Sequence, residues 1–206
     1  MRVLVCDDHS LFREGLRLLL EKLDASMEVT LTGSADEAVA ATKSGTFDLI
    51  LMDWHMEGLS GARALEALRE SAPLTRVVVL SGDRNAELVR SAIDLGAAGF
   101  IPKDSPPAQL MMAVRTIADG GVYLPTGGLA PIQTRDVRDA FPSLTDRQAD
   151  VLRAALRGNS NKLIARQLGI SDGTVKTHLR AIYQELGTRN RTEAVYMAAE
   201  QGVRIS

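Results

Sequence analysis

The chain has 206 residues, which suits one or two domains. It is 45% hydrophobic and 24% charged, and it contains no run approaching the roughly 18 uninterrupted apolar residues of a membrane helix. The single cysteine excludes an intramolecular disulfide framework, and residues 1–6 run directly into Asp7 and Asp8, unlike a secretory signal. We therefore expect a cytoplasmic protein without a membrane partner.

The net charge of −2 conceals an uneven distribution. Residues 1–122 hold 12 Lys and Arg against 18 Asp and Glu, whereas residues 143–206 hold 10 against 6. A solvated surface can carry such an imbalance without any function. An acidic front and a basic tail nevertheless indicate two tasks, the second on a polyanion.

Residues 1–120 alternate short apolar runs with segments of helical periodicity. The expected strands are 2–6, 28–32, 47–52, 76–80 and 99–101. Helical spacing follows each run, as between Leu11 and Leu23. Five such βα units predict an α/β domain with a doubly wound, five-stranded parallel sheet, whose functional groups gather at the carboxyl ends of the strands.

The rest of the chain has a different pattern. Residues 121–142 include three prolines and a Gly-Gly pair, which is typical of a linker. Residues 143–206 read as an all-α domain that opens with a capping box of Thr145 and Gln148. Within it, two short helices separated by Gly169 and Ser171 predict a helix-turn-helix. The predicted domains are therefore 1–120 and 143–206, joined by 121–142.

Polar side chains stand at the ends of four expected strands. Asp7 and Asp8 follow the first, Asp53 the third, Ser81 the fourth and Lys103 the fifth. Parallel strands present these ends at one edge, so the side chains should meet there. Three clustered carboxylates repel one another unless a cation neutralises them, and oxygen ligands suit Mg²⁺. A carboxylate nucleophile, a divalent metal, a hydroxyl and a lysine are the parts that phosphoryl transfer requires.

Each of these residues has an ordinary alternative interpretation. The Asp7-Asp8 pair can be a solvated turn, and Asp53 can cap a helix. For one residue that alternative would be preferred. The presence of all five at strand ends favours a functional site.

The same residues belong to a wider pattern that resembles a response-regulator receiver domain. The pattern comprises Asp7-Asp8, Asp53-x-x-Met56 with Gly61, Ser81 after Val-Val-Val-Leu, and Gly99-Phe100-Ile101-Pro102-Lys103. The opening is similar to the LuxR-type (NarL/FixJ) branch over Asp8-His9-x-Leu11-Phe12-Arg13-x-Gly15-Leu16. The resemblance covers nearly all of residues 1–120 and implies a flavodoxin-like receiver fold.

The resemblance also implies a role for each residue of the site. Asp53 would accept a phosphoryl group from a sensor histidine kinase, and Lys103 would pair with that group. Asp8, Asp53 and the backbone carbonyl of His55 would hold Mg²⁺, with Asp7 assisting through water.

Two further residues would form the switch. Ser81 would swing toward the phosphoryl group while Phe100 turns inward, which would alter the surface that dimerises or docks the output domain. The sequence departs from the family at Glu57, where proline is usual, and at Gly82, where alanine is usual. Both departures put the phosphorylation kinetics in question, but they leave the nucleophile in place.

Residues 143–200 resemble the LuxR-type helix-turn-helix. The motifs are Leu144-Thr145-x-Arg147-Gln148, Asn161-Lys162-x-Ile164-Ala165, Thr174-Val175-Lys176-x-His178-Leu179 and Arg189-Asn190-Arg191-Thr192. Lys176, Thr177 and Arg180 share one face of the third helix, from which side chains reach base edges of double-stranded DNA. The expected phosphate contacts are Thr174, Asn161, Lys162 and Arg191.

The helix expected from Thr192 is where such domains usually dimerise, and its Ala194, Val195 and Ala198 face is compatible with a homodimer. The three histidines fall in different elements with no cysteine nearby, so we expect no zinc site. Glycine-rich nucleotide-binding motifs are absent, so we expect no nucleotide cofactor.

Three functions remain open at this point. The first is a phosphorylation-switched transcription factor that is not itself an enzyme. The second is a pseudo-receiver, which would bind DNA under control of a ligand or partner. The third is a phosphatase with an aspartyl-phosphate intermediate, but it predicts a second acid two residues after the nucleophile, where His55 stands.

Overall fold

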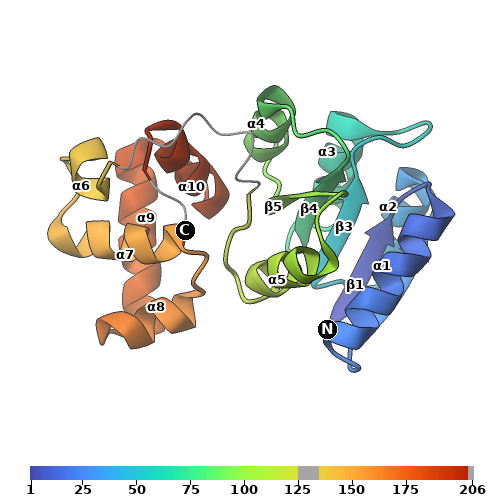
Figure 1. The fold of residues 1–206 in the computed structure, drawn as a ribbon, viewed down its shortest axis with the longest axis horizontal. Coiled ribbons are helices and arrows are strands. Elements are labelled where there is room, and N and C mark those ends of the chain that lie inside the picture. The colour runs from blue at the N-terminus through green and yellow to red at the C-terminus, as the bar shows by residue number, and fades with distance from the viewer. Residues whose placement is uncertain (125–134, 204–206) are drawn as a thin grey trace. The chain divides into compact units, whose positions relative to one another are not determined.

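The computed structural model describes residues 1–124 and 135–203. The chain divides into two compact units, Met1–Val114 and Arg115–Ser206 (Figure 1). Of the expected linker 121–142, residues 125–134 lie outside the described residues. The end of the expected linker contains regular structure, because Val137–Ala140 forms a short helix, α6.

The first unit contains one five-stranded parallel sheet, as predicted. Its strands are β1 Arg2–Cys6, β2 Glu28–Thr32, β3 Leu49–Asp53, β4 Arg76–Ser81 and β5 Gly99–Pro102. Their order across the sheet is β2-β1-β3-β4-β5. The direction of winding reverses between β1 and β3, and in open α/β sheets ligands bind outside the carboxyl ends of the strands at such a point.

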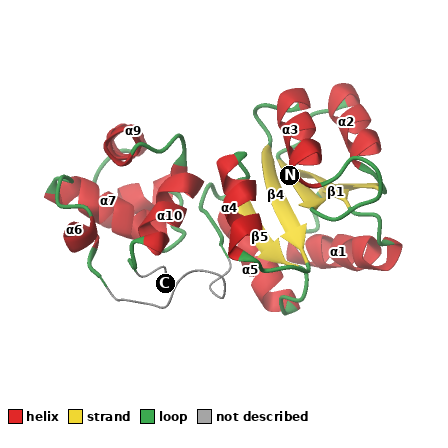
Figure 2. Cartoon of the chain, turned by 90° about the horizontal axis from the view of Figure 1, so that it is seen from above, coloured by secondary structure: helices red, strands yellow, loops and turns green. Residues whose placement is uncertain are grey.

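Helices cover both faces of the sheet (Figure 2). They are α1 Ser10–Leu23, α2 Ala35–Ser44, α3 Gly61–Ser71, α4 Ala86–Asp94 and α5 Pro107–Ala118. Helices α1 and α5 lie on one face, and α2 and α3 lie on the other. Every residue of β3 is buried, as expected of a central strand covered on both sides, whereas the edge strand β2 alternates between exposed and partly covered positions before its buried last residue, Thr32.

The strand ends differ slightly from the predicted ones. Strand β3 begins at Leu49 rather than at residue 47 and includes Asp53, and β4 extends by one residue to Ser81. Cys6 pairs with Met52, and Asp53 pairs with Leu80 in the ladder. Asp53 and Ser81 therefore belong to the hydrogen-bonded ends of the strands, where the ladder restrains their backbone, while Asp7, Asp8 and Lys103 follow strand ends.

The second unit is helical. Its remaining helices are α7 Asp146–Leu156, α8 Asn161–Leu168, α9 Asp172–Leu186 and α10 Arg191–Glu200. The predicted capping box at the start of α7 is present, with Thr145 Oγ1 accepting from Gln148 N and Gln148 Oε1 accepting from Thr145 N. The last helix starts at Arg191 with Asn190 as its cap, one residue before the expected Thr192.

The turn between α8 and α9 depends on two residues. Gly169 ends α8 in the left-handed conformation, with φ 64° and ψ 37°. Ser171 Oγ accepts a hydrogen bond from Thr174 N at 3.0 Å and so caps α9. These two features fix the helix-turn-helix that the sequence predicts.

We expect Gly169→Ala to destabilise the second unit by about 1–2 kcal/mol, because an L-residue in this backbone region is strained. Apart from its chain neighbours, no atom of the described residues lies within 4 Å of a Cβ placed there, so the cost is conformational rather than steric. Gly173→Ala, inside α9, should instead stabilise by about 0.5–1 kcal/mol. Urea denaturation followed by far-UV circular dichroism measures both, and equal stability of Gly169→Ala and wild type would contradict the assignment.

Candidate functional site

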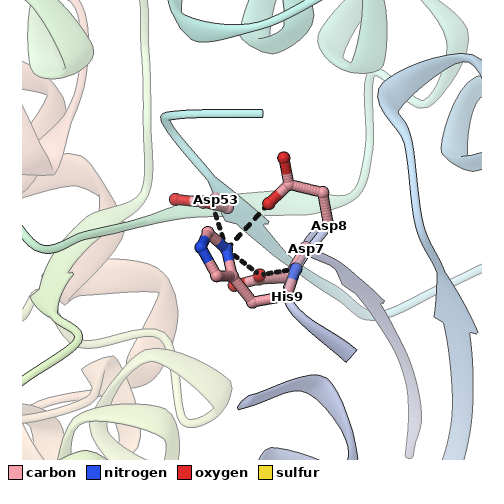
Figure 3. Close-up of side chains that lie close together, drawn as sticks. All are labelled: Asp7, Asp8, His9 and Asp53. Atoms are coloured by element: carbon pink, nitrogen blue, oxygen red, sulfur yellow. Dashed lines mark hydrogen bonds and ion pairs between the residues drawn. The ribbon is translucent and has the colours of Figure 1, made fainter. Parts of the chain in front are cut away.

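Three carboxylates converge at the carboxyl edge of the sheet, as predicted (Figure 3). Asp7 and Asp8 follow β1, and Asp53 ends β3, the neighbouring strand. The side chains of Asp7 and Asp53 are almost completely buried, at 0% and 2% exposure, while Asp8 is at 25%. Such a cluster is unfavourable unless positive charge balances it.

Lys103 supplies part of that charge. Its Nζ lies 2.7 Å from Asp7 Oδ2 and 2.8 Å from Asp53 Oδ2, so one ammonium joins the ends of β1 and β3. The lysine follows β5 and is anchored by its own N–H, which donates to the Ser81 carbonyl at 2.8 Å. Although burial opposes the charged form, the bonds to Asp53 and Asp7 raise the pKa of Lys103 above its usual value.

Burial raises the pKa of the Asp53 carboxyl above its usual value, although Lys103 opposes this shift. One oxygen, Oδ1, accepts a hydrogen bond from His55 N at 3.2 Å, and the other faces Lys103. The carboxylate is thus held in one orientation by a backbone donor and a cation. Asp7 is held similarly, because its Oδ1 accepts from His9 N at 2.8 Å.

The donor set fits a hard divalent cation. Within the described residues, Asp7 Oδ2, Asp8 Oδ1 and Asp53 Oδ2 are buried yet accept no well-aligned hydrogen bond. Two of these oxygens contact Lys103 as ion pairs, but one ammonium does not balance three carboxylates. Carboxylate oxygens with spare lone pairs are the ligands that Mg²⁺ prefers. The predicted contribution of the His55 carbonyl stays a prediction.

His9 also belongs to this cluster, which the sequence interpretation did not anticipate. Its Nδ1 lies 2.8 Å from Asp8 Oδ1, 3.3 Å from Asp7 Oδ1 and 4.0 Å from Asp53 Oδ2 (Figure 3). Its position directly after the two aspartates was the available signal. The wide separation of the three histidines in the sequence gave no sign of this contact.

The two residues expected to form the switch lie inside the first unit. Ser81 and Phe100 are both fully buried. Ser81 Oγ accepts a hydrogen bond from Asp83 N at 3.0 Å, which places the hydroxyl at the start of the loop after β4. A hollow of about 800 Å³ opens over Asp53, with Lys103, His55 and Asp83 in its lining, and it is large enough for a phosphoryl group to approach.

The two departures from the family have different consequences. Glu57 has an exposed side chain, and its backbone N–H donates to Asp8 Oδ2 at 3.0 Å. Proline has no N–H, so the usual residue could not make this bond. Gly82 has open space around a built Cβ and no left-handed φ, so nothing in the backbone requires glycine there.

In the second unit, α9 presents the predicted face. Lys176, Thr177 and Arg180 are exposed, whereas Val175 and Leu179 are buried. Lys176 Nζ pairs with Asp172 Oδ2 at 2.7 Å, an exposed contact that a phosphate or a base can displace at little cost. The helix therefore offers polar and cationic side chains along one side.

The expected phosphate contacts are less uniform. Thr174 and Lys162 are exposed, and Asn161 is partly buried. Arg191 is placed differently. Its Nη2 donates to the carbonyls of Ala155 (at 3.1 Å) and Asn159, and its Nη1 donates to Asn161 Oδ1 at 3.3 Å. The guanidinium is therefore used to tie α7 to α8, and we withdraw Arg191 from the phosphate contacts.

The expected dimerisation face of α10 also needs correction. Ala194, Val195 and Ala198 are 1%, 2% and 0% exposed, and α10 packs on α7 and α9 of the same unit. The apolar spacing on α10 thus reflects the core of this unit. Within residues 1–124 and 135–203, no helix is long and apolar enough to cross a membrane.

Comparison with known families agrees with both units. A model of the response regulator receiver domain matches residues 3–115. A model of the luxR family of bacterial regulatory proteins matches residues 142–198. Together they account for the acidic site and for the helix-turn-helix.

Whole proteins of similar length match as well. The glycerol metabolism activator of Pseudomonas putida is 35% identical over 97% of this chain and 95% of its own length. The nitrate/nitrite response regulator NarP of Escherichia coli is 35% identical over 97% and 95%. A NarL transcriptional regulatory protein of Mycobacterium tuberculosis is 37% identical over 98% and 94%.

Solved structures show the same fold. The NarL receiver domain from Mycobacterium tuberculosis is 37% identical, with a TM-score of 0.53, and covers 58% of this chain and 96% of that one. An RcsB–DNA complex is 21% identical, with a TM-score of 0.58, over 97% and 98%. The chain belongs to the LuxR-type (NarL/FixJ) family of two-component response regulators, and it is a DNA-binding transcriptional regulator with a receiver domain.

Proposed function

We propose that Asp53 is the phosphoacceptor through which a sensor histidine kinase controls DNA binding by this chain. The observation that carries the proposal is the buried Asp53 carboxylate, held between Lys103 and His55 N beneath an open hollow. A carboxylate that is oriented and desolvated in this way is prepared for in-line attack.

The chemistry follows from these groups. An Asp53 oxygen attacks the phosphorus of a phosphohistidine or of a small acyl phosphate. A P–O bond to Asp53 forms while the bond to the donor breaks, and the donor leaves with that electron pair. The Lys103 ammonium then pairs with the phosphoryl oxygens instead of the Asp53 carboxylate and stabilises their negative charge. Ser81 supplies a hydroxyl to the same group when its bond to Asp83 N is released.

The metal site completes the proposal. Asp7, Asp8, Asp53 and the backbone carbonyl of His55 would hold Mg²⁺, with Asp7 acting through water. The bound ion would neutralise charge on the carboxylates and the incoming phosphoryl group. Apart from accepting phosphate from small donors and losing it to water, the chain catalyses no reaction in this proposal.

The output is binding to double-stranded DNA in the cytoplasm. Lys176, Thr177 and Arg180 would read base edges, and Lys162, Thr174 and Asn161 would contact phosphates. RcsB, which shares the fold, has been solved as a complex with DNA. A phosphorylated homodimer would engage two half-sites, with Ser81 and Phe100 moving together to expose the dimerising surface.

Incubation with acetyl phosphate and Mg²⁺ should add one phosphoryl group to the wild type and none to Asp53→Asn, because only the former has the nucleophile. Intact-protein mass spectrometry measures the gain. A gain in both proteins would move the acceptor away from Asp53. No gain in the wild type over a range of times and Mg²⁺ concentrations would sink the proposal.

We expect Asp53→Asn to be more stable than the wild type at neutral pH in EDTA. Burial raises the folded-state pKa of Asp53, so ionisation disfavours folding at pH values above that pKa. The advantage should disappear as the pH falls below the unfolded pKa of about 4. Melting temperatures across this pH range measure it, and added Mg²⁺ should stabilise the wild type more. An advantage of the variant that persists at low pH would contradict this assignment.

Lys176→Ala and Arg180→Ala should each weaken binding to a preferred sequence by about 1–3 kcal/mol and relax the choice of base. Lys162→Ala should weaken binding to all sequences alike and reduce the salt dependence. Arg90→Ala, which removes the same charge from the receiver domain, is the control. Fluorescence anisotropy at several salt concentrations separates these cases, and equal losses on every sequence would contradict base reading by α9.

A further inference from the structure

His9 is the residue of the acidic site to which the proposed function gives no role. Its backbone N–H donates to Asp7 Oδ1, which pins the residue at the carboxyl edge of the sheet. Its side chain is 68% exposed, yet the imidazole turns back over the carboxylates (Figure 3). One ring nitrogen of His9 and one carboxylate oxygen each of Asp7, Asp8 and Asp53 all lie within 4.8 Å of one another.

The distances from His9 Nδ1 to oxygens of Asp8 and Asp53 match positions in an octahedral metal site. In an octahedron with metal–ligand distances of about 2.1 Å, neighbouring ligand atoms are about 3.0 Å apart and opposite ones about 4.2 Å. His9 Nδ1 lies 2.8 Å from Asp8 Oδ1, 3.3 Å from Asp7 Oδ1 and 4.0 Å from Asp53 Oδ2. For the two carboxylates that would hold the ion directly, Asp8 matches a neighbouring position and Asp53 an opposite position, while Asp7 would contact the ion through water.

We propose that His9 Nδ1 is a ligand of the receiver metal site. Imidazole nitrogen binds Co²⁺, Ni²⁺ and Zn²⁺ better than it binds Mg²⁺, which prefers carboxylate and water oxygens. With His9 in place, the site gains affinity for these borderline ions relative to Mg²⁺. The inference rests on the proposed function in using the same carboxylates, but it concerns which ion they select.

The affinities can be read from Trp54, the sole tryptophan of the sequence, which directly follows Asp53. Quenching or enhancement of its fluorescence reports titrations with Co²⁺ and Mg²⁺. His9→Ala should weaken Co²⁺ binding by about tenfold or more and change Mg²⁺ binding much less. His178→Ala, in α9, is the matched control and should change neither. Equal losses for both ions in His9→Ala would reduce His9 to a structural role and overturn the proposal.

A direct test uses Mn²⁺ bound to the full-length chain. Pulsed electron paramagnetic resonance should detect a coordinated ¹⁴N in the wild type and in His178→Ala, but not in His9→Ala. A signal that persists in His9→Ala, or bound Mn²⁺ without any nitrogen coupling in the wild type, would overturn the proposal.

The proposed function is tested separately, by measuring phosphorylation of the wild type by acetyl phosphate with Mg²⁺ as the sole divalent ion. Uptake at Asp53 without nitrogen coupling would reject the role of His9 and leave the phosphoacceptor standing. Nitrogen coupling without uptake would support the role of His9 and reject the phosphoacceptor.

Discussion

The contact on which the site depends is the ammonium of Lys103 between Asp7 and Asp53. Two almost completely buried carboxylates on neighbouring strands would otherwise repel each other, and the strand ends would separate. Lys103 can reach both because it follows β5, which lies next to β4 in the sheet. Its backbone N–H donates a hydrogen bond to the Ser81 carbonyl, which holds the residue in place. The parallel sheet thus provides a rigid frame, and a single ammonium offsets part of the repulsion at its acidic edge.

The same contact is what phosphorylation must change in the proposed mechanism. When the Asp53 oxygen becomes part of an acyl phosphate, Lys103 exchanges a carboxylate partner for a phosphoryl group with more charge. Ser81 and Phe100 lie buried on the adjoining strands β4 and β5, so a new position for the loops after these strands requires repacking rather than simple rotation in solvent. Repacking of a dense core has discrete solutions, which is the physical basis for a two-state switch.

Much of this arrangement follows from local sequence. The buried run Leu49–Asp53 and the valines of β4 predict central parallel strands. Parallel strands bring Asp7, Asp53 and Lys103 to one edge of the sheet regardless of the exact strand bounds. Positions decided by distant partners could not be predicted in the same way. Arg191 lies in a basic stretch typical of a DNA contact, but its guanidinium donates hydrogen bonds to the carbonyls of Ala155 and Asn159. The alanines of α10 have the spacing of an interface, but α7 and α9 already cover them. His9 directly follows the two aspartates, but the pattern of strands and helices does not predict that its imidazole turns toward the carboxylates.

The central claim is that the acidic edge controls the helix-turn-helix through phosphorylation of Asp53. A DNA fragment selected from a random pool by the full-length chain allows the most direct measurement. Its dissociation constant is determined with and without acetyl phosphate and Mg²⁺, for wild type and Asp53→Asn, with phosphorylation checked by mass. The account predicts tighter binding on phosphorylation of the wild type and no response from the variant. Phosphorylated wild type that binds DNA no differently from the unmodified chain would contradict it.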